Sequence, residues 1–108
     1  MTEYLQVVLC TVPDHDKAET IADTLVTERL AACINIVPGV TSIYRWKDVI
    51  ERDQELLLLI KTSLTAWPRL EERIRSLHPY ELPEIIAVPV SKGQADYLTW
   101  LKNSLTTS

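Results

Sequence analysis

The segment HPYELPE, from His78 to Glu84, places an imidazole, a phenol and two carboxylates among two prolines. Each proline fixes its own φ angle and biases the residue before it toward extended backbone, so the segment presents its side chains at set positions. A segment of this kind could support a functional site, or it could form a rigid corner between a helix and a strand.

Cys10, at the end of the apolar run YLQVVLC, could add a thiol to this set. A thiol, an imidazole and carboxylates at one rim suit a soft or borderline metal ion such as copper, or a Cys–His nucleophile pair. Taken alone, Cys10 is also typical of a small buried hydrophobe, and His78 of a side chain that bonds the last carbonyls of a helix. Tyr80 and Glu84 could equally be hydrogen-bonding residues of an interface.

Two other patterns are weaker candidates. The Asp14-His15-Asp16 run looks metal-like, but it stands where a helix is expected to begin, and Asp there serves the helix dipole. Cys–His hydrolysis would need oxyanion donors, which usually come from glycine-rich turns or helix starts. The chain has two glycines, Gly39 and Gly93, and neither is near Cys10 in the sequence. We therefore expect a protein that is not an enzyme.

The composition is that of an acidic, ordinary folded chain. A net charge of −4 and a pI near 5.1 argue against a nucleic-acid or anionic-membrane partner, because no basic excess exists to meet phosphates. No basic-then-apolar signal opens the chain, and its longest apolar run, Leu56 to Ile60, is too short to cross a bilayer. We expect a single domain over residues 1–108, a cytoplasmic setting and reduced thiols.

Hydrophobic patterning predicts the elements that must position these residues. Their order is a strand at 4–11, a helix capped by Asp16, strands at 34–46 and 49–62, a helix capped by Thr65 and stopped by Pro79, a strand at 85–90, and a C-terminal helix with Tyr97, Leu98, Leu101 and Leu105 on one face. Lys47-Asp48 joins the two long strands as a hairpin. The predicted hairpin pairs are Trp46–Val49, Tyr44–Glu51, Ile36–Leu59 and Ile34–Lys61.

Two βαβ units that share one hairpin predict an α+β fold, the ferredoxin-like βαββαβ sandwich, with antiparallel sheet order 4-1-3-2. Pro38 and Pro89 fall in the second and fourth strands, which this order puts at the edges, where strand prolines belong. The fourth strand begins beside the end of the first, so the HPYELPE side chains are expected near Cys10 and Thr11. Cys33 falls at the opposite end of the sheet, and no internal disulfide is expected.

The strand sequences also point beyond a single chain. A two-layer sandwich covers one face of its sheet, yet the strand segments LLLLI and IIAVPV do not alternate apolar and polar residues. The long hairpin would protrude by roughly 15 Å beyond its neighbours, an aggregation hazard if left unpaired. We therefore expect self-association, with Trp46 at the hairpin tip as an anchor between subunits. A monomer with imperfect alternation is the alternative.

Four segments, LAACINIVPGVTSIYRWK, ELLLLIKTSL, SLHPYELPEIIAVPV and DYLTWL, together resemble the CutA divalent-cation-tolerance family, over about Val8 to Trp100. The resemblance implies a ferredoxin-like protomer in a tight homotrimer, a cytoplasmic setting, and a role in tolerance to copper and other divalent metals. It also implies similarity to trimeric PII-type signalling proteins. No well-defined catalytic reaction comes with the family.

In enterobacterial members of that family, copper ligation is assigned to the strand cysteine and to two adjacent histidines before the proline–tyrosine pair. By this resemblance Cys10 and His78 are metal ligands, with copper expected ahead of other divalent metals such as zinc. Leu77 stands where the first histidine would be, and leucine cannot ligate a metal. Two ligands fall short of the three or four of a tight site, which Glu84, Glu81 or a neighbouring subunit could complete.

Two functions of different class follow. The first is a trimeric metal-binding or metal-responsive protein with Cys10 and His78 as ligands. The second is a PII-like trimeric signalling or scaffold module, with a pocket at the subunit interface for an anionic or polar small molecule. The residues expected to line that pocket are Tyr44, Trp46, Tyr80 and Glu84.

Overall fold

The computed structural model describes residues 4–106 of the chain. Its elements are β1 (Leu5–Val12), α1 (His15–Thr27), β2 (Cys33–Trp46), β3 (Val49–Ser63), α2 (Trp67–Leu77), β4 (Ile86–Pro89) and α3 (Ala95–Asn103). The strands form one antiparallel sheet in the order β2-β3-β1-β4. The predicted ferredoxin-like sandwich is confirmed, and Pro38 and Pro89 lie on its two edge strands.

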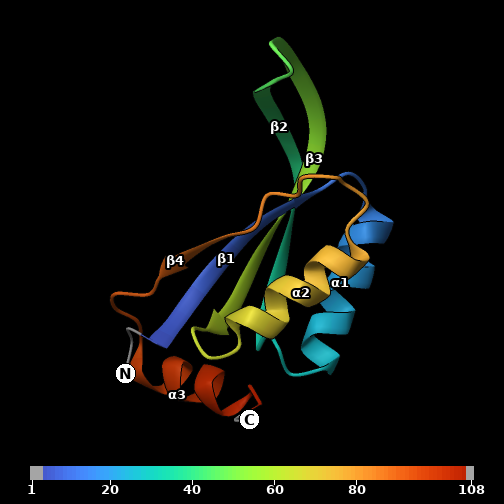
Figure 1. Cartoon of the computed structure of the whole chain (residues 1–108). Helices are drawn as coiled ribbons and strands as arrows, with labels where there is room; N and C mark the ends of the chain where they lie inside the picture. Colours follow the sequence, from blue (N-terminus) through green and yellow to red (C-terminus); the bar gives the residue numbers. More distant parts are fainter. Residues whose placement is uncertain (1–3, 107–108) are drawn as a thin grey trace.

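Helices α1 and α2 lie against one face of the sheet (Figure 1). The core beneath them includes the fully buried residues Val8, Cys10, Ile21, Leu25, Leu58, Ile60, Leu70 and Ile74. Helix α3 lies at one end of the sheet, where Leu101 and Leu105 pack with Leu5. The opposite face is left partly open, since Ile86 and Val88 of β4 remain 52% and 46% exposed.

Both helix starts in the first two-thirds of the chain differ from the prediction. Asp14, not Asp16, caps α1, because its backbone is extended and its carboxylate can accept an amide of the first turn at 2.8 Å. Asp16 already lies in that first turn. Thr65 does not cap α2, since a turn continues past it and the N-cap position falls on Ala66, which offers no side-chain cap.

The β2–β3 hairpin closes at Lys47-Asp48, as predicted. Both turn residues have positive φ, 51° and 68°, the geometry of tight two-residue turns whose twist matches the flanking strands. Trp46 pairs with Val49 and Tyr44 with Glu51, in the predicted register. The arms rise well beyond the rest of the sheet (Figure 1), and the molecule measures 44 × 25 × 22 Å.

A β-bulge at Pro38-Gly39 shifts the hairpin register nearer the body of the sheet. The observed pairs are Ile36–Leu58 and Ile34–Ile60, so the predicted pairs Ile36–Leu59 and Ile34–Lys61 are wrong by one residue. Gly39 has a φ of +76°, which suits the extra residue of a bulge. Because strand side chains alternate between faces, the shift turns Ile34 and Ile36 toward the helix-covered core, where both pack.

The far end of the hairpin carries exposed apolar side chains. Ile43, Val49 and Ile50 are 55%, 56% and 55% exposed, and Trp46 is 37% exposed. Neighbouring aliphatic and aromatic side chains of this kind are typical of interaction surfaces.

Cys10 and Cys33 are free thiols, as expected. Within residues 4–106, no helix is long and apolar enough to cross a membrane.

Candidate functional site

His78 directly follows α2 and starts the HPYELPE corner with extended backbone, φ −79° and ψ 136°. Its imidazole is buried, and its Nε2 lies 2.7 Å from the carbonyl oxygen of Thr11. Its Nδ1 accepts a hydrogen bond from the backbone amide of Tyr80 at 3.1 Å. Since Nδ1 accepts, Nε2 carries the proton and donates to Thr11. The ring thus ties the corner to the end of β1, where the topology predicted it.

Cys10 lies in β1 directly before Thr11, with its side chain in the core covered by α1 and α2. The thiol is fully buried, and its Sγ lies 3.9 Å from the Thr11 carbonyl oxygen. Burial, together with smaller contributions from the negative charges of Glu84 and Glu55, raises the pKa of the Cys10 thiol to about 12. The thiol is therefore protonated at neutral pH.

The structure brings the predicted ligands Cys10 and His78 to the same end of the sheet, but it does not surround them with further ligands. Among residues 4–106, no group of three or more His, Cys, Asp or Glu side chains is placed to hold a metal ion. Leu77 packs against the core. The described part of one chain therefore supplies at most two ligands here, and both nitrogens of His78 are engaged in hydrogen bonds.

The Asp14-His15-Asp16 run serves the helix start. Asp14 is the N-cap of α1, and His15 lies 3.7 Å from Glu19 one turn later, with both side chains largely exposed. The metal-like spacing of this run therefore reflects capping chemistry, as the sequence suggested.

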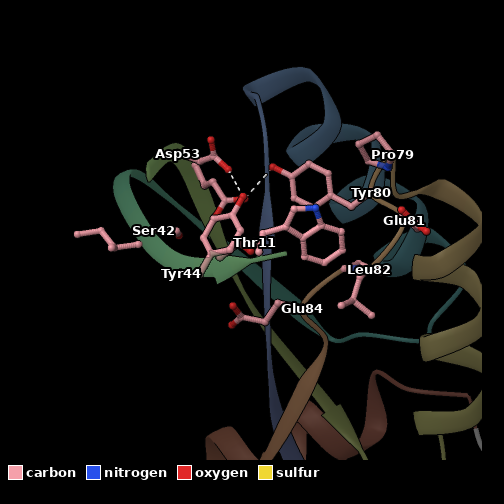
Figure 2. A pocket seen from close by; sticks show the side chains of 13 residues that line it. Thr11, Ser42, Tyr44, Asp53, Pro79, Tyr80, Glu81, Leu82 and Glu84 are labelled. Atoms are coloured by element: carbon pink, nitrogen blue, oxygen red, sulfur yellow. Dashed lines mark hydrogen bonds between the residues drawn. The ribbon is translucent and has the colours of Figure 1, made fainter. Parts of the chain in front are cut away.

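A cavity of about 750 Å³ lies between the hairpin and the HPYELPE corner, within the size range of small-molecule sites. Figure 2 shows Tyr44 and Asp53 on one side of it and Pro79, Tyr80 and Leu82 on the other. The four residues proposed from the sequence, Tyr44, Trp46, Tyr80 and Glu84, all line it. The remaining lining residues are Thr11, Ser42, Ile43, Asp53, Glu55, Pro79, Glu81, Leu82 and Pro83.

The bulge in β2 explains why hairpin residues face this cavity. Beyond Gly39, even-numbered residues of β2 pair with odd-numbered residues of β3, for example Ser42 with Asp53. Tyr44 and Ser42 therefore share a face with Asp53, and the Tyr44 hydroxyl donates a hydrogen bond to the Asp53 carboxylate. That hydrogen bond raises the pKa of Tyr44 to about 12.

Glu55 is the most buried carboxylate of the lining, only 6% exposed. The Tyr80 hydroxyl donates to its Oε2 at 2.7 Å. Burial raises the pKa of Tyr80, and the hydrogen bond to Glu55 adds to the effect. The Tyr80 ring also packs on His78, with ring centroids 4.7 Å apart, so Tyr80 contacts the predicted ligand His78 as well as the cavity.

Sequence reasoning missed Asp53, Glu55 and Thr11 as lining residues. A signal for two of them exists, because the segment ERDQE places Glu51, Asp53 and Glu55 on one face of β3 at a spacing of two. Among the residues that the structure describes, the lining holds four carboxylates, those of Asp53, Glu55, Glu81 and Glu84, and no Lys, Arg or His. This charge disfavours the anionic ligand that the sequence left open.

Comparison with known proteins adds a family to this geometry. Residues 6–104 match the family model described as CutA1 divalent ion tolerance protein. The chain is 58% identical over 99 residues to the divalent-cation tolerance protein CutA of Thermus thermophilus, and the match covers 92% of this chain and 96% of that protein. It is 45% identical over 98 residues to the chloroplastic protein CutA of Arabidopsis thaliana, covering 91% of this chain and 54% of that protein.

Solved structures give the same result. The crystal structure of CutA1 from Oryza sativa superposes with a TM-score of 0.94 at 42% identity, covering 99% of this chain and 98% of that chain. The CutA1 structure from Thermus thermophilus superposes with a TM-score of 0.93 at 56% identity, covering 94% and 99% of the two chains.

Proposed function

This chain belongs to the CutA1 divalent ion tolerance family, and from that premise we propose that it acts as a homotrimer that binds copper, in the cytoplasm and without catalysis. One observation carries the proposal. The imidazole of His78 is hydrogen-bonded to the carbonyl of Thr11, the residue that directly follows Cys10. A soft sulfur and a borderline nitrogen donor at one place favour copper over harder cations.

The charges around Cys10 favour a bound cation. Burial is the main reason why the thiol keeps its proton, and the carboxylates of Glu84 and Glu55, which add to that effect, would stabilise a metal ion on the thiolate. A metal ion must therefore displace a tightly held proton. To bind His78, the metal ion must also break the hydrogen bond between His78 Nε2 and the Thr11 carbonyl, because the lone pair at His78 Nδ1 already accepts the amide of Tyr80.

The trimer enters the proposal for two reasons. A tight site needs three or four ligands, and the described residues of one chain offer two, so a neighbouring subunit is the natural source of the rest. The exposed apolar residues of the hairpin and of β4 need a cover that one chain does not supply, including Ile43, Val49, Ile50, Ile86 and Val88.

The proposal excludes a Cys–His reaction because the thiolate, not the thiol, is the nucleophile, and Cys10 remains a thiol at neutral pH. A cytoplasmic setting agrees with two free thiols, which a reducing compartment preserves. Imaging of the tagged full-length chain in its own cell tests the location, and signal confined to another compartment would overturn it.

The test is copper(I) binding under reducing conditions, measured by competition with a coloured chelator. Cys10→Ser should lower the affinity at least tenfold, or about 1.4 kcal/mol, and His78→Ala should lower it less. Leu77→His should raise it by adding an imidazole donor. Cys33→Ser, which removes the other thiol, is the matched control and should bind as the wild type does. Equal copper affinity of Cys10→Ser and wild type would show that Cys10 is not a copper ligand.

A second function is favoured by the cavity of about 750 Å³. It lies between the protruding hairpin and the HPYELPE corner, and it is lined by three aromatic rings and several polar groups, the composition of a ligand site. We propose that the protein also binds a small molecule there, as a PII-like signalling or scaffold module would. Protection of Tyr80 and Trp46 from chemical labelling by a bound metabolite would support this function.

A further inference from the structure

We propose that this cavity binds a flexible organic cation with several amino groups, that is, an aliphatic polyamine. The inference rests on the second function above and gives its ligand a chemical class. It is carried by three features of the lining: its charge, the burial of Glu55, and the hydrogen-bonding direction of its polar groups.

The first feature is an uncompensated negative charge. Asp53, Glu55, Glu81 and Glu84 line the cavity, and the lining described by residues 4–106 contains no Lys, Arg or His. Within residues 4–106 the Arg73–Glu28 ion pair and the close contact of His15 with Glu19 lie elsewhere. A concave surface with charges of one sign concentrates the opposite charge. The ligand is therefore a cation.

The second feature is the burial of one of these carboxylates. Glu55 is 6% exposed, and its described partner is the neutral hydroxyl of Tyr80. A carboxylate taken out of water is costly unless a cation or several hydrogen bonds compensate it. No Lys or Arg among the described residues forms an ion pair with it. A cation in the cavity would supply the missing compensation.

The third feature is that the polar lining mainly accepts hydrogen bonds. The Tyr44 hydroxyl donates to Asp53 and the Tyr80 hydroxyl donates to Glu55, so the protons of both phenols are already used. What remains is chiefly carboxylate oxygen, which accepts only. A ligand that fits must donate, as ammonium groups do, and a quaternary ammonium without N–H groups would leave these acceptors unmet.

The spread of the carboxylates separates a polyamine from a metal ion. Within residues 4–106 no three ligand side chains converge as one ion would require. A chain of amines places its charges several bonds apart and can reach separated carboxylates at once. Its methylene segments would pack on the rings of Tyr44, Trp46 and Tyr80, whose faces also attract ammonium groups. The Trp46 ring already takes the Lys47 ammonium in this way, 5.7 Å from its centroid.

Calorimetric titration of the full chain in its native assembly tests this inference, with spermidine as the probe. Spermidine should bind, and its fully N-acetylated, uncharged analogue should bind at least tenfold more weakly. Glu55→Gln and Asp53→Asn should each lower spermidine affinity at least tenfold. Glu72→Gln, which removes the same charge from the exposed face of α2, should change it less than twofold. Circular dichroism and thermal melting establish that each variant is folded.

The outcomes separate the proposals. If the uncharged analogue binds as well as spermidine, the cavity is a ligand site and the polyamine inference is wrong. If neither compound binds the wild type, the inference is likewise overturned. Copper binding is judged separately: Cys10→Ser should lose copper and keep spermidine, and Asp53→Asn should lose spermidine and keep copper. Loss of both ligands in Asp53→Asn, in a folded protein, would show that copper and spermidine binding share Asp53 and would overturn the proposal of two separate sites.

Discussion

The hydroxyl of Tyr80 and the carboxylate of Glu55 share a 2.7 Å hydrogen bond that joins the HPYELPE corner to β3, 25 residues away in the sequence. The contact fixes one wall of the cavity to the other. Because Glu55 is buried, the phenol is also the group that satisfies its charge within the chain.

Removing the hydroxyl of Tyr80 should destabilise the folded protein. Tyr80→Phe leaves a buried carboxylate without its donor, and we expect the free energy of unfolding to fall by about 1–3 kcal/mol. Tyr44→Phe is the matched control, because it removes the same group from Asp53 at a position that is 41% exposed. Chemical denaturation at equal protein concentration measures both. Equal losses in the two variants would contradict the role assigned to Glu55 burial.

Cys10 should make the protein less stable at alkaline pH. The unfolded thiol ionises near its ordinary pKa of 9.0, whereas the folded thiol keeps its proton until pH about 12. The stability contributed by the protonated thiol is therefore complete below pH 9 and is lost as pH rises toward 12, with a slope of up to about 1.4 kcal/mol per pH unit. Cys10→Ala should lose stability less steeply across this range in denaturation curves. Parallel pH profiles would be the contrary result.

The raised pKa of Cys10 also predicts how copper binding depends on pH. If the metal replaces one proton on this thiol, affinity should rise about tenfold per pH unit throughout the neutral range, since the pKa lies far above it. Chelator competition at several pH values measures the slope, and Cys10→Ser should flatten it. A wild-type affinity that does not change with pH would place the metal on other ligands.

The exposed hairpin predicts the effect of a charge on assembly. Ile43 is 55% exposed in the single chain, and Ile43→Asp should dissociate the proposed trimer, because a charge buried in an interface without a partner costs about 3–5 kcal/mol. Thr20→Asp adds the same charge on exposed α1 and should leave assembly unchanged. Native mass spectrometry at low micromolar concentration reports the state. A monomeric wild type would refute the trimer outright.

The positive φ angle of Gly39 should determine how much each substitution there lowers stability. A Cβ atom there would meet no other atom within 4 Å, so the cost of Gly39→Ala comes from its φ of +76° and should be about 1 kcal/mol. Gly39→Asn should cost less, because asparagine adopts positive φ more readily. Thermal melting of both variants checks the order, and an alanine variant as stable as the wild type would be inconsistent with it.

Hydrophobic patterning predicted the topology because strand order and edge positions follow from element order and from the prolines at 38 and 89. It predicted the tip of the hairpin, since pairing counted from Lys47-Asp48 is local. It missed the bulge, although Pro38-Gly39 inside a strand is a recognisable bulge signal. The register beyond that point was wrong for this reason.

Some residues of the candidate site could likewise be predicted from the sequence, and others could not. Tyr44, Trp46, Tyr80 and Glu84 could be proposed because each stands at the hairpin tip or in the corner, which topology brings together. The ERDQE spacing could have placed Glu55 on the cavity face, but its burial and its hydrogen bond to Tyr80 could not be predicted, because no local pattern in the sequence encodes that distant contact. The engagement of both nitrogens of His78 was likewise invisible without coordinates.

The edge position of β4 has a consequence for the order of folding. The hairpin closes across a two-residue turn and loses little loop entropy, whereas pairing Gln6 with Pro89 must bring nearly the whole chain together. We expect the hairpin to form early and β4 to join the sheet late. Hydrogen exchange during refolding would test this through the amide of Val90, which donates to Leu5, and the amide of Tyr80, which donates to His78. Late protection at both would mean that a newly made chain acquires its acidic cavity only in the final folding step.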